Sequence, residues 1–177
     1  MRRAYVIRPA EAPDAPALSA LKHATFRETF LEDFAIPYPA DDLAVFEAQA
    51  YGVEAVTAEL ADPVHRTWVV DAPSGELAAY AHVGPCKLPH SDVHAGSGEI
   101  YQLYILRAHQ GAGLGRRLME TALEWLEVHR PGPVWLGVWS GNARAQAVYA
   151  RFGFQPVGTY EFAVGNHRDL ECILKRG

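Results

Sequence analysis

The chain has 177 residues, of which 49% are hydrophobic and 21% are charged, and its formal net charge is −5. This length and balance predict one globular domain with a sizeable core, spanning residues 1–177. The mild acidity argues against a nucleic-acid partner and is compatible with a cationic substrate. No apolar stretch approaches the ~20 residues of a membrane span or resembles a signal-peptide core, so we expect no membrane association and a cytoplasmic location.

The cysteines and histidines bear on whether the protein forms disulfides or binds a metal. The two cysteines, Cys86 and Cys172, form neither a disulfide framework nor a CxxC pair, so we expect reduced thiols. Cys86 is followed by His90, Asp92 and His94, a spacing with a superficial likeness to a metal-ligand set. A structural zinc site uses about four ligands in paired spacings, and a second cysteine is missing here. We therefore predict no metal and interpret this segment as a flexible loop near the substrate.

The N-terminal third is predicted to be mostly helical. Tyr5–Arg8 alternates in polarity and indicates a short edge strand. A helix is expected to begin near Asp14, whose side chain suits an N-cap. A second helical region covers Asp41–Leu60, with an interruption near Gly52.

The middle of the chain combines strands with a glycine-rich turn. Thr67–Asp71 and Glu76–Val83 are rich in strand formers and flank a turn containing Pro and Gly, which predicts a hairpin. Gly84–Gly98 follows as a polar loop, and Glu99–Leu106 is a strand of aromatic and branched residues. Gly113–Arg130 has the clearest helical stripe of apolar residues.

The C-terminal part adds a strand, a helix and a closing hairpin. Val134–Trp139 is the strand, and Asn142–Phe152 is a short helix that stops at Gly153. Gln155–Val164 and His167–Lys175 pair about a Gly-Asn turn. This order is neither an all-parallel nor a simply alternating one, so it predicts an α/β fold with a mixed sheet and helices on both faces.

The glycine-rich turn carries the most information about function. Glycines there allow a tight turn and a close ligand approach, and the first amides of the following helix have no internal acceptors. Such a turn binds a phosphate group without a metal, or it is simply a turn without a ligand. The spacing differs from the Gly-Lys-Ser/Thr loop of nucleotide hydrolases and from the dinucleotide fingerprint. The turn consists of Gln110, Gly111, Ala112, Gly113, Leu114, Gly115 and Arg116.

The turn resembles the pyrophosphate-binding motif (Q/R)-x-x-G-x-G/A of the GNAT superfamily of N-acetyltransferases, through Gln110, Gly113 and Gly115. The segment from Asn142 to Tyr149, with the Arg-Phe-Gly-Phe that follows, is similar to that family's second motif. The resemblance implies a single GNAT domain with a mixed, mostly antiparallel sheet of about six or seven strands. It also implies helices on both faces and a bulged, splayed central strand.

The resemblance extends to a narrower branch. Segments outside the two motifs look like the branch that contains bacterial polyamine acetyltransferases of the PaiA type. These segments are Thr25–Phe30, Pro39–Leu43, Glu59–Pro63 and Tyr160–Leu170.

The resemblance implies acetyl-CoA (coenzyme A) as cofactor and assigns residues to hold it. The main chain of Leu103, Tyr104 and Ile105 would pair with the pantetheine arm and the acetyl carbonyl. Gln110 through Arg116 would hold the pyrophosphate. Asn142 would either cap its helix or hydrogen-bond to the cofactor arm, and its position alone leaves both open.

Tyr149 is predicted to be the general acid, and it is also counted among the residues that bind the cofactor. A departing thiolate has a conjugate pKa near ~8.5, and a phenol near ~10 protonates it if held close. The alternative is a helix tyrosine that only packs against the sheet.

The general base is not determined by the motifs. Some family members place a glutamate five residues before the Asn, and here that position is Gly137. We choose Glu99, because it begins the strand that would present the thioester. The alternatives are Glu28, Tyr101 and His82, acting directly or through water.

Aromatic residues supply the candidate acceptor site. They form either the acceptor wall or ordinary core. The residues assigned to the substrate are Phe26, Phe30, Tyr38 and Tyr101, with Phe34 nearby.

The preferred function is transfer of acetyl from acetyl-CoA to a small-molecule primary amine, polyamines included, by direct attack in a ternary complex. The alternatives are a protein N-alpha or lysine acetyltransferase, a catalytically silent coenzyme-A-binding regulatory module, and a nucleotide or dinucleotide enzyme. A homodimer would be ordinary for the family.

Overall fold

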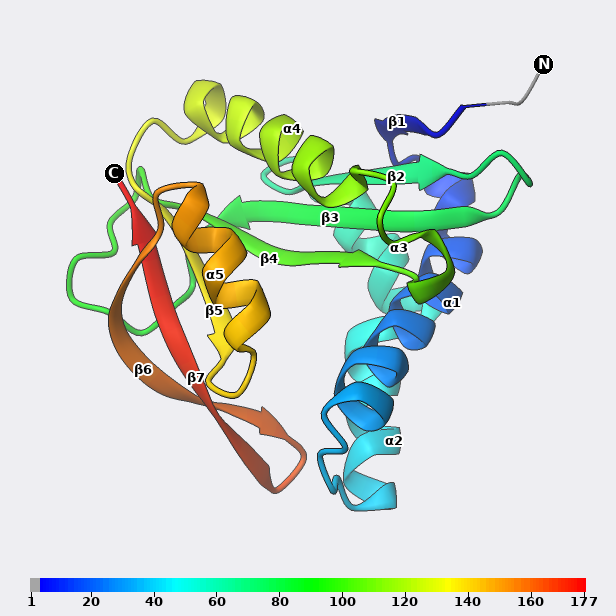
Figure 1. Cartoon of the computed structure of the whole chain (residues 1–177), viewed down its shortest axis with the longest axis horizontal. Coiled ribbons are helices and arrows are strands. Elements are labelled where there is room, and N and C mark those ends of the chain that lie inside the picture. Colours follow the sequence, from blue (N-terminus) through cyan, green and yellow to red (C-terminus); the bar gives the residue numbers. More distant parts are fainter. Residues whose placement is uncertain (1–3) are drawn as a thin grey trace.

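The computed structural model describes residues 4–177, which form a sheet with helices on both faces (Figure 1). The strands are β1 (Val6–Pro9), β2 (Arg66–Asp71), β3 (Leu77–Pro85), β4 (Gly98–Ile105), β5 (Val134–Trp139), β6 (Gln155–Val164) and β7 (His167–Arg176). The helices are α1 (Ala15–Phe26), α2 (Ala40–Tyr51), α3 (Val53–Ala61), α4 (Leu114–His129) and α5 (Ala143–Arg151). Short helical segments are η1 (Ala12–Asp14), η2 (Arg27–Asp33) and η3 (Arg107–His109).

The seven strands lie in the order β1-β2-β3-β4-β5-β7-β6. Every neighbouring pair is antiparallel except β4 and β5, which are parallel. The expected mixed, mostly antiparallel sheet is therefore confirmed. The crossover that a parallel pair requires is supplied by α4, which connects β4 to β5 across one face of the sheet.

The central strand β4 is both bulged and splayed, as expected. Its register to β3 shifts between His82 and Val83, so that Tyr101 is an extra residue on β4. Its pairing with β5 is limited to Gly98↔Val134 and Glu99↔Trp135, after which the strands separate (Figure 1). The bulge and the splay thus lie on opposite edges of β4, and the edge facing β5 lacks a strand partner beyond Glu99.

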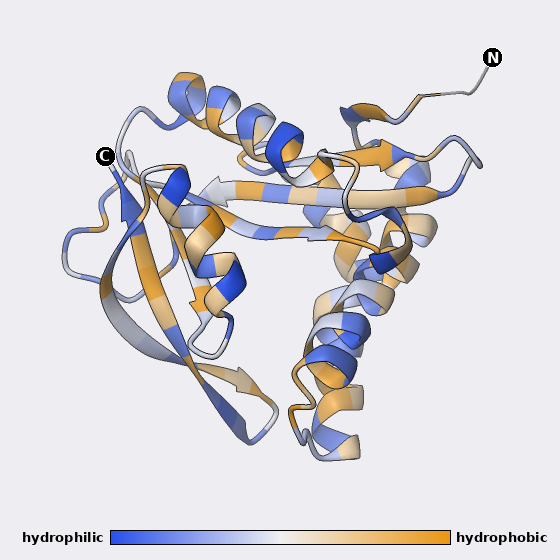
Figure 2. Cartoon of the chain, in the orientation of Figure 1, coloured by the Kyte–Doolittle hydropathy of each residue, from blue (hydrophilic) through white to orange (hydrophobic). Residues whose placement is uncertain are grey.

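Helix α4 covers one face of the sheet. Its apolar side contributes Leu118, Ala122 and Leu126, each fully buried, to a core shared with β2 through β5. Figure 2 shows hydrophobic and hydrophilic residues alternating along α4, as expected of a helix with one buried side. Partly buried Ala145 and Tyr149 of α5 pack against the same core.

Helices α1 and α3 cover the opposite face. Leu18 and Val56, both 0% exposed, pack on Val69 and Tyr80 of the sheet. Because successive strand residues point to opposite faces, the neighbours of Val69 and Tyr80 belong to the α4 core.

Local expectations in the N-terminal region need two corrections. Helix α1 begins directly after Asp14, as expected, but the Asp14 carboxylate makes no capping hydrogen bond to α1: it accepts from the Glu11 amide at 2.7 Å and from Arg8. The π-helical η2 after α1 was not predicted. The interruption at Gly52 is confirmed, since it separates α2 from α3. A Cβ at Gly52 would lie 2.5 Å from the Ala48 carbonyl oxygen, so a side chain does not fit there.

Candidate active site

The glycine-rich turn between η3 and α4 has the conformation that a ligand-binding turn requires. Gly111 and Gly113 have φ of +82° and +75°, a region that favours glycine, and a Cβ at either would meet nothing within 4 Å. The turn is exposed, whereas Leu114 is 1% exposed in the core and fixes the start of α4. The Gln110 side chain donates to the Ile105 carbonyl at 3.3 Å, which ties the turn to the end of β4.

These features fit the diphosphate of coenzyme A. The first amides of α4 are free of helical acceptors, and the open glycine positions leave room for phosphate oxygens. Arg116 lies within the turn, but its guanidinium pairs with Glu120 at 2.7 Å and is largely exposed. The backbone amides, more than Arg116, are therefore the donors that the turn offers to an anion.

The C-terminal half of β4 is the second part of the predicted cofactor site. The side chains of Leu103 and Ile105 pack toward the α4 core, and Tyr104 packs toward α1 on the other face. The side chains are thus structural, as their residue types suggest. The main chain on the β5 edge has no strand partner in the described chain, which suits an extended pantetheine arm.

Helix α5 places Asn142 and Tyr149 beside this edge. Asn142 Oδ1 accepts from the Ala145 amide at 3.0 Å, so Asn142 is the N-cap. Its side-chain NH2 group has no partner among residues 4–177 and could donate elsewhere. The Tyr149 ring packs 6.1 Å from that of Phe154, and its hydroxyl has no hydrogen-bond partner in the described residues. Burial, followed by the charge of Glu171, raises the pKa of Tyr149 to about 12.

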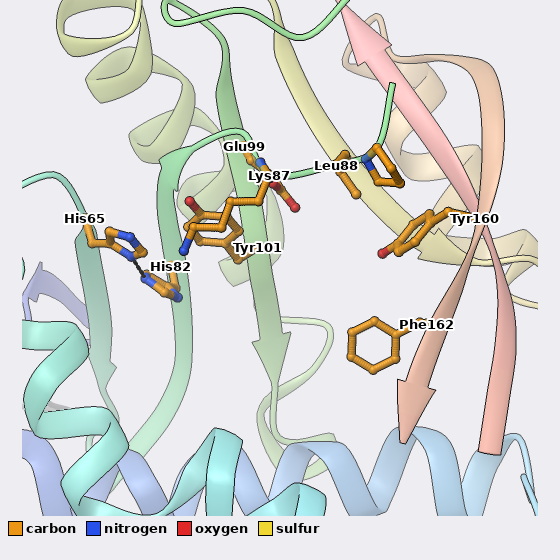
Figure 3. Close-up of a pocket in the computed structure, with 9 residues that line it drawn as sticks. His65, His82, Lys87, Leu88, Glu99, Tyr101, Tyr160 and Phe162 are labelled. Carbon is orange, nitrogen blue, oxygen red and sulfur yellow. Dashed lines mark hydrogen bonds between the residues drawn. The ribbon is translucent and has the colours of Figure 1, made fainter. Parts of the chain in front are cut away.

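A pocket of about 270 Å³ opens on the face opposite α4, next to the point where β4 and β5 separate. In Figure 3, His82 and Tyr101 approach it from β3 and β4, and Tyr160 and Phe162 approach it from β6. Its lining residues are His65, His82, Lys87, Leu88, Pro89, Glu99, Tyr101, Tyr160 and Phe162.

Glu99 lies in this pocket at the last paired position of β4 and β5. It is 7% exposed, and one carboxylate oxygen accepts from the Lys87 amide at 2.8 Å. Burial raises its pKa to about 7, partly offset by the hydrogen bonds from Lys87 and Cys86. A carboxylate with this pKa exchanges protons near neutrality.

The other three candidates for the base are engaged elsewhere. The Tyr101 hydroxyl donates to the Pro85 carbonyl, and burial raises its pKa. His82 is buried, its pKa is lowered by burial, and its ring nitrogens contact His65 at 2.8 Å and Glu59 at 3.3 Å. Glu28 lies outside the pocket lining, where it accepts from the Arg107 amide at 2.8 Å.

Of the four predicted acceptor residues, Tyr101 lines the pocket, whereas Phe26, Phe30 and Tyr38 form a separate aromatic cluster around η2 outside the pocket lining. Phe26 is 4% exposed and sits beneath the others, with its ring centroid 4.9 Å from Phe30 and 5.9 Å from Tyr38. Phe30 reaches Tyr104 of β4 at 6.2 Å. The Tyr38 hydroxyl donates to Asp169 of β7. Phe26 is therefore part of the core. Phe30 lies between the N-terminal helices and β4, and Tyr38 lies between those helices and β7.

Several pocket residues were not anticipated from the sequence. Lys87 places its Nζ 5.1 Å above the Tyr101 ring, and His65 stacks on the same ring at 5.3 Å. Tyr160 donates to Glu171 at 2.8 Å across the β6–β7 hairpin. These residues come from separate segments and belong to no local motif. Only the alternation of side chains along each strand could have indicated that they lie on the same face of the sheet.

No cluster of three or more His, Cys, Asp or Glu side chains within residues 4–177 is placed to hold a metal ion. The loop histidines are used locally: His90 accepts from the Asp92 amide and His94 from the Gly96 amide, both at 3.1 Å. None of the helices in the described chain has the length and apolar character needed to cross a membrane.

Comparisons with known proteins agree with this geometry. Residues 23–154 match the Acetyltransferase (GNAT) family. An uncharacterized N-acetyltransferase from the pepI 3′ region of Lactobacillus delbrueckii subsp. lactis is 28% identical over 163 residues, covering 92% of this chain and 91% of that protein. The spermine/spermidine N(1)-acetyltransferase of Bacillus subtilis (strain 168) is 29% identical over 91 residues, covering 50% of this chain and 59% of that protein.

The fold has a solved counterpart. The PaiA N-acetyltransferase from Thermoplasma acidophilum, in complex with coenzyme A, matches with a TM-score of 0.74 over 98% of this chain and 99% of that chain, at 15% identity. The family match spans well over half of the chain and includes the glycine turn, β4 and α5. The chain belongs to the acetyltransferase (GNAT) family, and it is an acetyl-CoA-dependent N-acetyltransferase.

Proposed function

We propose that this enzyme acetylates a small-molecule primary amine, with polyamines as the first acceptors to test. The observation that carries the proposal is the pocket at the separation of β4 and β5, because it combines a buried carboxylate with aromatic walls. A carboxylate and aromatic faces are the groups that recognise an alkylammonium ion. The spermine/spermidine N(1)-acetyltransferase among the relatives supports the choice of acceptor.

Two parts of the chain would hold the cofactor on the other side of the gap. The amides of the turn from Gln110 to Arg116 would bind the diphosphate, and the free edge of β4 at Leu103–Ile105 would pair with the pantetheine arm. The Asn142 NH2 group is free to donate to the same arm, since only Oδ1 is used for capping. Acetyl-CoA, when bound, supplies an acetyl thioester whose carbonyl carbon an amine can attack.

Glu99 is the proposed proton acceptor for the amine. An alkylammonium ion has a pKa near ~10 and must lose a proton before it is a nucleophile. With its pKa raised to about 7, Glu99 is a stronger base than an exposed glutamate and is still largely ionised above neutrality. It lies in the pocket and at the base of the gap, where it would reach the amine directly or through water.

Tyr149 is the proposed proton donor to the leaving sulfur. Its hydroxyl has no partner among residues 4–177, and its pKa of about 12 keeps it protonated across the neutral range. A thiolate that leaves into a site with little water is a stronger base than a thiolate in water, which favours proton transfer from the tyrosine.

The test is thiol release from acetyl-CoA by the purified protein against a panel of acceptors. The panel contains spermidine, simple alkylamines, an aminoglycoside, and peptides with free N-termini or lysines. We expect saturable turnover with at least one small alkylamine and much lower kcat/KM with the peptides. Turnover confined to peptides would overturn the small-molecule proposal in favour of a protein acetyltransferase. Binding of coenzyme A without turnover on any acceptor would favour a silent binding module.

A further inference from the structure

Strand β5 carries a glycine, Gly137, where it borders the gap between β4 and β5. Residues of β5 alternate between the faces of the sheet: Leu136 and Val138 join the α4 core, whereas Trp135 and Gly137 point the other way, toward the pocket. A Cβ built on Gly137 would lie 2.5 Å from the Tyr160 hydroxyl and 3.0 Å from Glu171 Oε2. The space of that side chain is thus filled by a tyrosine and a carboxylate from the neighbouring hairpin.

The strand register explains how this pair reaches β5. Glu171 of β7 pairs with Trp139 on one side and with Tyr160 on the other, so all three point to the same face. Trp139 contacts Phe34 with ring centroids 4.6 Å apart, which identifies that face as the one covered by the N-terminal helices. Glu171 is therefore on the pocket side of the sheet, where its carboxylate lies over Gly137 and contacts Tyr160, a residue of the pocket lining.

The charge of Glu171 is not neutralised within the described chain. Two other buried or partly buried carboxylates have a cation: Glu47 pairs with Arg27 at 2.8 Å, and Glu59 pairs with Lys22 at 2.6 Å. Glu99, like Glu171, has no ion-pair partner among residues 4–177. Glu171 has no ion-pair partner among residues 4–177, and its one hydrogen bond is the 2.8 Å bond from Tyr160. A half-buried carboxylate left without a cation is costly, unless a cationic ligand supplies the missing charge.

The groups around Glu171 disfavour its negative charge, except for Tyr160, and none of them supplies a cation. Burial raises the pKa of Glu171, the bond from Tyr160 lowers it, and the charge of Asp169 two residues earlier raises it. Glu99 of β4 and Tyr149 of α5 also feel the charge of Glu171. The one lysine of the pocket, Lys87, projects over the Tyr101 ring at 5.1 Å instead of pairing with Glu171.

We infer that Glu171, held in place by Tyr160, binds the ammonium form of the acceptor over Gly137 and makes the enzyme selective for cationic alkylamines. This inference rests on the proposed function and adds a specificity-determining residue to it. Tyr160 uses one lone pair of the carboxylate, and the remaining ones are open to an ammonium group. Glu171 thus delivers the acceptor as a cation, and Glu99 takes its proton.

The experiment compares wild type with Glu171→Gln on two matched acceptors. Benzylamine is a cation at neutral pH, and aniline is a similar but neutral amine. Loss of a charge-assisted hydrogen bond costs about 1.5–3 kcal/mol, so we expect the KM for benzylamine to rise about 10- to 100-fold. The KM for aniline and for acetyl-CoA should change less than about 2-fold, because neither involves this charge.

Two further variants and a binding measurement distinguish a loss of amine binding from damage to the fold. Glu161→Gln removes an exposed carboxylate from the opposite face of the same hairpin and should leave every constant unchanged. Gly137→Ala places a methyl group 2.5 Å from the Tyr160 hydroxyl and 3.0 Å from Glu171 Oε2, so both side chains must shift, and the KM for benzylamine should also rise selectively. Titration of benzylamine into the coenzyme A complex, followed by calorimetry, should show the same loss of affinity in Glu171→Gln without any turnover.

The outcomes are distinguishable. An active wild type in which Glu171→Gln behaves like Glu161→Gln, or affects benzylamine and aniline equally, would overturn this inference and leave the proposed function intact. A wild type that releases no thiol with any amine would overturn the proposed function itself.

Discussion

Burial sets the protonation of the side chains around the gap between β4 and β5. Glu99 and Tyr149 both have raised pKa values, and in both the largest cause is loss of water around the charged form. The result suits acetyl transfer to an amine, because the carboxylate becomes a better base and the phenol stays protonated. Neither effect depends on a cation placed beside the group, so both should persist at high salt.

Glu99→Gln tests the assignment of the base through the pH dependence of activity. In wild type, kcat/KM for the amine should rise with pH as Glu99 loses its proton around pH 7. The Gln variant should lose about 100-fold or more in kcat/KM and no longer show that ionisation. The measurement is the pH–rate profile of both proteins, and a variant that keeps the wild-type profile would transfer the base role to another group.

The same substitution should also change stability with a defined sign. The folded-state pKa of about 7 exceeds the unfolded value of 4.5, so the folded protein binds the extra proton between these pH values. The free energy of unfolding of wild type therefore falls as pH rises through this window. We expect the Tm of Glu99→Gln relative to wild type to be higher at pH 8 than at pH 5, as thermal unfolding at each pH would show.

Tyr149→Phe tests the acid. Because the hydroxyl makes no hydrogen bond in the described residues, its removal should leave the Tm and the coenzyme A affinity close to wild type. The loss of a general acid should lower kcat about 100- to 10,000-fold. Steady-state kinetics with the best acceptor provide the measurement, and a variant with near-normal kcat would mean that Tyr149 only packs against the sheet.

At the scale of elements, the turn into α4 and the edge of β4 form one unit. The Gln110 side chain joins the turn to the Ile105 carbonyl, and buried Leu114 fixes the first turn of α4 against the sheet. The parallel pairing of β4 with β5 ends after Glu99. A diphosphate held at the turn would therefore direct the rest of coenzyme A along the open edge of β4 toward the pocket.

Gly113→Ala tests the turn and has a matched control. Gly113 and Gly75 both have positive φ, +75° and +94°, and both have open space where the methyl group of an alanine would lie. Alanine at either position should cost about 1–2 kcal/mol of stability, because it strains the left-handed backbone. Only Gly113→Ala should weaken coenzyme A binding, by about 10-fold, as measured by calorimetry. Equal affinities in the two variants would show that the diphosphate binds elsewhere.

At the scale of the whole molecule, the candidate site is closed by contacts between the two ends of the chain. Tyr38 after η2 donates to Asp169 of β7, and Phe46 of α2 lies 5.8 Å from Phe162 of β6. Figure 1 shows the N-terminal helices and the β6–β7 hairpin converging below the gap. The acceptor pocket is thus built from segments that are far apart in the sequence, whereas the turn into α4 is local.

Features controlled by neighbouring residues could be predicted from the sequence. The interruption at Gly52, the hairpin from β2 to β3 and the Asn142 cap each depend on local backbone geometry. Asp14 does precede α1 at the N-cap position, but its side chain makes no capping bond, because Arg8 and the Glu11 amide occupy its carboxylate. The π-helical segment η2 was not predicted, because no sequence pattern marks it. Its aromatic side chains contact distant elements, such as Tyr104 of β4, and a local pattern does not record such contacts.

The sequence by itself determined the family, the strand order of the local hairpins and the turn at residues 110–116, because glycine placement and polarity periods act over a few residues. Only the tertiary structure decided which carboxylates lie on the pocket side of the sheet. Glu99 and Glu171 lie 72 positions apart by residue number (171 − 99), and they face the same gap because β7 inserts beside β5 in the sheet. Long-range strand order and burial, which no short pattern encodes, placed Glu171 over Gly137 and shifted the pKa of Glu99.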